Sequence, residues 1–87
     1  MHEESLIRAL LRQVEQVATA ESASRVTAVH VWCGALSHFT ADHFREHFDR
    51  AAAGTLAQGA DVDVVVSDDA THPDAAHVRL DSLDVER

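Results

Sequence analysis

Two hydrophobic periods alternate along this chain, and this alternation restricts the fold more than any other feature. Between about residues 4 and 20 the apolar side chains recur every three or four positions, which is the period of a helix with one apolar face. The segment 25–33 is short, rich in β-branched residues and bounded by Gly34, which is typical of a strand. The opening of the sequence therefore predicts a helix followed by a strand.

A second helix is predicted over residues 41–53. Thr40 is a good N-cap for it, and Gly54 is well placed to end it. Phe44 and Phe48 lie one helical turn apart, so they should share the face that packs on the core.

Two further strands are predicted, at about 61–67 and within 77–87, separated by a polar turn around Pro73. The order is therefore α-β-α-β-β. The β-α-β part predicts two parallel strands joined by a crossover helix, and the last two strands predict an antiparallel hairpin. Both helices should cover one face of a small three-stranded mixed sheet, which makes an α/β fold with two layers.

Alternation also divides the first strand into two faces, of which the one richer in valine should face the core. The predicted core face comprises Thr27, Val29, Val31 and Cys33, and the opposite face comprises Val26, Ala28, His30 and Trp32.

Charge and composition exclude several classes of function. A formal net charge of −8 argues against binding to a phosphate backbone, so nucleic acid is not an expected partner. No apolar run approaches the roughly 20 residues of a membrane span, and no signal peptide is expected. Cys33 is the single cysteine, which is consistent with a cytoplasmic protein. Nucleophile-elbow and phosphate-loop motifs are absent, so we expect no enzymatic activity.

The first three residues, Met1-His2-Glu3, form a candidate metal site. The amine of Met1, the amide nitrogen of His2 and its imidazole Nδ1 could chelate one ion, and Glu3 offers a further donor. Met1 should be retained, because His2 is too large for the enzyme that removes initiator methionine. A nitrogen-rich square-planar set suits Ni(II) or Cu(II), whereas Zn(II) prefers a tetrahedron. In the simpler interpretation, His2 is a solvated residue at a helix end.

Several motifs in combination resemble the nickel-incorporation proteins of the HypA type. They include MHEESLI at the start, RVTAVHVWCGALS, HFREHF, GTLAQGADVDV and the closing LDSLDVE. The matching positions are Met1, His2, Glu3, Ser5 and residues 26–29, 34–37, 54–60 and 80–86.

The resemblance implies that Met1, His2 and Glu3 hold Ni(II). It also implies a metallochaperone that works with a GTP-hydrolysing maturation partner and serves the large subunit of nickel-iron hydrogenase or, in some bacteria, urease. Family members carry a zinc domain with two C-x-x-C pairs between the last two strands, and here the segment 67–77 stands in its place. We therefore expect one nickel-binding-type domain over residues 1–87 and no structural zinc. The alternative is an interaction or scaffold module of the maturation machinery that carries no metal.

Histidines elsewhere leave other interpretations open. His43 and His47 lie four residues apart on the second helix with Glu46 nearby, so they could share a metal, but a solvated face is the preferred interpretation. His38 could approach the N-terminus in space.

The polar turn carries a second candidate cluster. His72 and His77, with the aspartates around them, could form an accessory cation site, although a merely soluble acidic turn is preferred. Trp32 could be covered by a second copy of the chain, as in a homodimer, or remain a half-buried surface residue. Cys33 is expected to be a core thiol.

Overall fold

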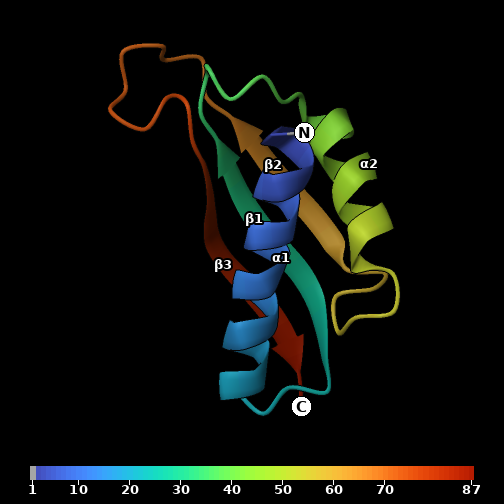
Figure 1. Ribbon diagram of the computed structural model, residues 1–87. Coiled ribbons are helices and arrows are strands. Elements are labelled where there is room, and N and C mark those ends of the chain that lie inside the picture. The colour runs from blue at the N-terminus through green and yellow to red at the C-terminus, as the bar shows by residue number, and fades with distance from the viewer. Residues whose placement is uncertain (1) are drawn as a thin grey trace.

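The computed structural model describes residues 2–87, and for His2 it describes the backbone alone. The chain forms two helices and one three-stranded sheet, with both helices on the same face of the sheet (Figure 1). The predicted two-layer α/β architecture and its α-β-α-β-β order are confirmed. The elements are α1 (His2–Ala20), β1 (Arg25–Cys33), α2 (Ala41–Ala52), β2 (Asp61–Val66) and β3 (Val78–Glu86).

Each helix is held by the apolar stripe that its sequence predicts. The inner face of α1 is buried along its length, with Ile7 and Val14 at its centre. Thr40 caps α2, since its Oγ1 accepts a hydrogen bond from the backbone N–H of His43 at 3.1 Å. Phe44 and Phe48 are fully buried beneath α2 with their rings stacked, so they fix which face of this helix meets the sheet.

β1 is the central strand, and this arrangement corrects the predicted hairpin. The sheet order is β2-β1-β3, with β2 parallel and β3 antiparallel to β1. The segment 67–77 is longer than the roughly two to five residues of a tight hairpin, so it can carry the chain past the end of β1. β3 then pairs along the whole of β1, from Arg25 to Cys33, whereas β2 offers only a shorter ladder.

A β-bulge in β1 corrects the predicted inner face. Val26 is buried, whereas Thr27 is only partly buried and donates a hydrogen bond to the carbonyl of Asp84 at 3.2 Å. The register against β3 shifts between Val26 and Ala28, which leaves Thr27 as the extra residue. One inserted residue reverses the alternation, so the inner face runs Val26, Val29, Val31 and Cys33.

Gly34 follows β1 in sequence and packs against the segment 67–77. Its N–H donates to the carbonyl of His77 at 2.8 Å. A Cβ at this position would collide with the backbone of Asp74 and Ala75, so only glycine allows this close approach.

No helix within residues 2–87 is long and apolar enough to cross a membrane.

Candidate metal centre

The N-terminal ends of α1 and α2 lie beside each other (Figure 1), and they bring three metal-ligating side chains together. Glu3 comes from the first turn of α1, and His43 and His47 come from successive turns of α2. One ligand atom from each side chain lies within 4.8 Å of the other two. Among the side chains that the structure describes, no other group of histidine, cysteine or acidic residues converges in this way.

Core packing sets the direction of both imidazoles. His43 and His47 immediately precede the buried Phe44 and Phe48, so each is rotated about a quarter turn from the core-facing side of α2. At this angle an imidazole lies on the flank of α2, and α1 is the element that packs there. The burial of the phenylalanines therefore determines the side of α2 on which both histidines lie, without any contribution from a metal.

The three side chains are close but not locked. The Nδ1 atom of His43 lies 4.0 Å from a carboxylate oxygen of Glu3. The rings of His43 and His47 are 4.5 Å apart between centroids and meet at 69°. The side chain of His43 is 38% exposed and that of Glu3 is 43% exposed, so water and ions reach both.

Nearby arginines are engaged elsewhere and do not compete for Glu3. Arg50 pairs with Glu46 at 2.8 Å, and Arg8 pairs with Glu4 at 3.1 Å. Glu46, which the sequence suggested as the companion of the histidine pair, is therefore occupied. The carboxylate at the pair is Glu3, which is distant in sequence and contributed by the other helix.

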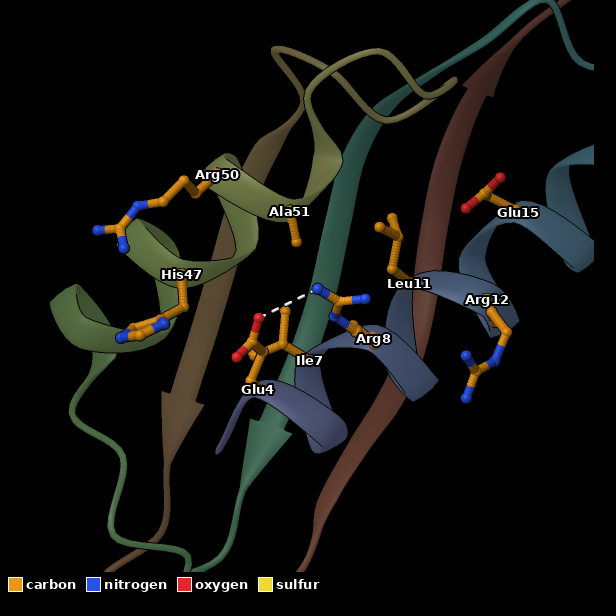
Figure 2. Close-up of a pocket in the computed structure, with 9 residues that line it drawn as sticks. All are labelled: Glu4, Ile7, Arg8, Leu11, Arg12, Glu15, His47, Arg50 and Ala51. Carbon is orange, nitrogen blue, oxygen red and sulfur yellow. Dashed lines mark hydrogen bonds and ion pairs between the residues drawn. The ribbon is translucent and has the colours of Figure 1, made fainter. Parts of the chain in front are cut away.

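A groove of about 550 Å³ lies between the two helices, and His47 is the one member of the cluster that lines it (Figure 2). His47 and Arg50 line it from α2, and Arg8 and Leu11 line it from α1. Its charged side chains are of both signs, so the groove has no single-sign field. It gives solvent a route to the imidazole of His47.

The predicted terminal site is described only in part. Met1 and the side chain of His2 lie outside the described residues. The backbone of His2 begins α1, and Glu3 follows in its first turn. The first N–H groups of a helix have no intrahelical acceptor, so the amides of His2 and Glu3 are not engaged within the helix ladder.

The remaining predicted candidates are separate from this cluster. His72 uses Nδ1 to accept the backbone N–H of Asp74 at 2.9 Å, and its ring lies 4.9 Å from that of Trp32. The guanidinium of Arg79 covers the same indole at 4.4 Å, so the chain itself shields part of Trp32. His77 and His38 are exposed. Neither belongs to a converging group of ligands in the described part of the chain.

Cys33 occupies the core, as the sequence predicts. Its thiol is fully buried, and burial raises its pKa to about 11, so it remains protonated at neutral pH. A protonated thiol in an apolar core does not bind metal.

Glu3 is the member of the cluster that sequence reasoning did not connect with the histidine pair. The signal was present in the two apolar stripes, because both helices had to cover one face of the same small sheet. The apolar stripes do not specify how far α1 and α2 are displaced relative to each other along their axes. This displacement determines which turn of α1 lies beside which turn of α2.

Comparisons with known proteins agree with this fold. The family model described as "Hydrogenase/urease nickel incorporation, metallochaperone, hypA" matches residues 1–72. A hydrogenase maturation factor HypA from Methylocella silvestris is 37% identical over 70 residues, which cover 78% of this chain and 62% of that protein. Its counterpart from Thermococcus kodakarensis is 40% identical over 65 residues, which cover 75% of this chain and 47% of that protein. The matches therefore span about half to two thirds of these relatives.

Solved structures show the same fold. A solution structure of the Ni metallochaperone HypA from Helicobacter pylori superposes with a TM-score of 0.79 at 19% identity, covering 97% of both chains. A second solution structure of a HypA protein gives a TM-score of 0.73 at 22% identity and covers 98% of this chain and 96% of the other. At these identities the likeness establishes the architecture.

Proposed function

The chain belongs to the HypA family of hydrogenase and urease nickel-incorporation metallochaperones, and we propose that it carries Ni(II) for the maturation of nickel-iron hydrogenase or urease. The proposed ligands are the amine of Met1, the amide and imidazole of His2, and one donor from Glu3. A square plane built on nitrogen donors suits Ni(II) and explains why the first three residues, rather than a cysteine cluster, would hold the cargo.

The start of α1 is the observation that carries this proposal. Because the helix begins at His2, its first amides have no partner in the helix ladder and can turn toward an ion. The positive field at a helix N-terminus also favours the negative charge that an amide nitrogen gains when it loses its proton. Glu3 supplies the local negative charge that a divalent cation requires, whereas Glu4 pairs with Arg8.

A carrier must release what it binds, and the proposed site suits that task. It includes Glu3, whose side chain is 43% exposed, so a partner can approach the ion there and replace its ligands one at a time. We propose a GTP-hydrolysing maturation protein as the co-worker, the large subunit of hydrogenase as the recipient, and the cytoplasm as the location. On this proposal the protein is a carrier and not a catalyst.

The proposed domain organisation is a single nickel-binding-type domain. β2 and β3 are joined by the segment 67–77, and the resemblance to the family implies that its zinc module would stand at this place. This segment is held to Gly34 and Leu36 by backbone hydrogen bonds, which close this end of the fold. We propose that nickel binding does not require structural zinc.

A Ni(II) titration followed by calorimetry and absorbance tests the proposal. It compares the chain with a free Met1 amine against His2→Ala and against a variant with one residue added before Met1. His77→Ala is the matched control, because it removes an exposed imidazole far from the terminus in sequence. We expect one Ni(II) with square-planar absorbance in the native chain and in the control, and loss of this species in the other two.

Two results would contradict the terminal site. If all four chains bind Ni(II) alike, the cargo is held by other side chains. If none of them binds Ni(II), the chain is a docking module of the maturation machinery and not a carrier.

A further inference from the structure

We propose that Glu3, His43 and His47 form a second divalent-metal site, built from side chains alone. It differs in kind from the proposed terminal site, because it needs neither the free amine of Met1 nor a deprotonated amide. The two sites share only Glu3, so each can be removed while the other remains.

The donor set identifies the class of ion. Two imidazoles and one carboxylate suit first-row ions such as Zn(II), Co(II) and Ni(II), whereas Mg(II) and Ca(II) prefer oxygen ligands alone. Two histidines at positions i and i+4 of one helix can bind the same ion, because this spacing places both on one side. Three protein ligands leave at least one position for water or for a ligand from a partner.

The distances allow these side chains to close around an ion. Ligand bonds of about 2.0–2.2 Å in a tetrahedron place neighbouring donor atoms about 3.3–3.6 Å apart. The donor atoms here lie within 4.8 Å of one another, and the Nδ1 of His43 is already 4.0 Å from Glu3. Small rotations of half-exposed side chains cover the remaining gap without any movement of α1 or α2.

The charged side chains around the cluster favour a cation. Glu3 brings a carboxylate to the two imidazoles, and the arginines on this side of the molecule face other acids. Arg45 pairs with Asp42 at 2.9 Å and donates to the carbonyl of Val62, which directs its guanidinium toward β2. Arg50 is held by Glu46 one turn away. An ion at the cluster therefore meets a net negative set of ligands.

We expect folding to be independent of this site, which makes the site testable by substitution. The packing of α2 rests on the buried Phe44 and Phe48, and its start rests on the cap at Thr40. Replacing a half-exposed histidine or Glu3 leaves these contacts in place. Far-UV circular dichroism of each variant should show that the fold is kept.

The test is a Co(II) titration of the chain that carries one residue before Met1, because this addition disables the terminal site. We expect one Co(II) with visible ligand-field absorption, displaced by one Zn(II). His43→Ala, His47→Ala and Glu3→Gln in the same extended chain should each weaken binding about tenfold or more, because even outer partners of metal ligands contribute about 10- to 100-fold. His77→Ala should bind like the extended parent.

The proposal is overturned if the extended chain gives no ligand-field spectrum. It is also overturned if the three variants bind Co(II) as tightly as the parent while remaining folded. Neither result affects the terminal site, which is tested with Ni(II) on the native chain. Conversely, a terminal site that fails with Ni(II) leaves the Co(II) result on the extended chain unchanged.

Discussion

Two regions of the molecule place their imidazoles in opposite surroundings. On the uncovered face of the sheet, His30 contacts Asp63 through Nδ1 at 3.1 Å and Asp84 through Nε2 at 3.2 Å. Both nitrogens of its ring are thus engaged, one by a carboxylate of β2 and the other by a carboxylate of β3. Between the two helices, one ligand atom each of His43, His47 and Glu3 lies within 4.8 Å of the other two.

Strand geometry and helix geometry explain the contrast. The parallel register places Asp63 directly opposite His30, so cross-strand pairing satisfies the ring. Two packed helices have no such ladder, and side chains at their ends converge without being paired one to one. Converging donor atoms without one-to-one partners among the described side chains, and not the number of histidines, therefore single out the candidate metal site between the helices.

The largest expected effect is the removal of both imidazoles from α2. In the chain with a blocked terminus, the double variant His43→Ala, His47→Ala should lose Zn(II) affinity by about a hundredfold or more, since two of three ligands are gone. The double variant His72→Ala, His77→Ala should leave the affinity unchanged. Competition against a chromophoric chelator measures both, and equal losses in the two variants would erase the contrast between the regions.

Zn(II) should also stabilise the fold through the same cluster. At a free concentration of about 100 times Kd, a ligand that binds only the folded state adds about 2.7 kcal/mol to the free energy of unfolding. Urea unfolding of the extended chain with and without Zn(II) measures this gain. The gain should vanish in the His43→Ala, His47→Ala variant and persist in His72→Ala, His77→Ala. A gain that survives in both would place the ion elsewhere.

Gly34→Ala should damage the turn region and spare the cluster. The added methyl group meets the backbone of Asp74 and Ala75, which cannot move aside as a flexible side chain can. The free energy of unfolding should fall by about 1–3 kcal/mol, in the range of other overpacked sites. Co(II) stoichiometry of the folded, extended variant should remain one. Gly54→Ala is the matched variant. At Gly54 the backbone has a positive φ of 83° and an added Cβ meets no neighbouring atom, so this variant measures the effect of backbone strain without a collision.

The smallest expected effect is a pH dependence at His30. The carboxylates of Asp84 and Asp63 raise its pKa above the ordinary value of 6.5, so folding favours the protonated ring. The stabilisation is therefore complete below pH 6.5 and is lost as pH rises through the raised pKa.

The comparison of the native chain with His30→Asn isolates this term. The difference in their free energies of unfolding should shrink as pH rises from 6 to 9, because the native ring loses its charge. Urea titrations at several pH values measure it. A difference that grows with pH would mean that the carboxylates do not stabilise the charged ring.

The sequence was sufficient for the elements and their layers, because apolar periods and the Thr40 cap are local signals. It was insufficient where a feature depends on two distant segments. The bulge at Thr27 depends on the register against β3, and the position of β3 beside β1 depends on which edge offers the longer ladder. The approach of Glu3 to His43 depends on how far the two helices are displaced along their axes.

X-ray absorption of the native chain loaded with one Ni(II) tests the central claim most directly. A terminal site of amine, amide and imidazole nitrogens should give the edge feature of square-planar Ni(II) and scattering from a single imidazole. A six-coordinate spectrum with two imidazoles would contradict the account. In that case the cargo would be held by the side chains of α2, and not by the first residues of the chain.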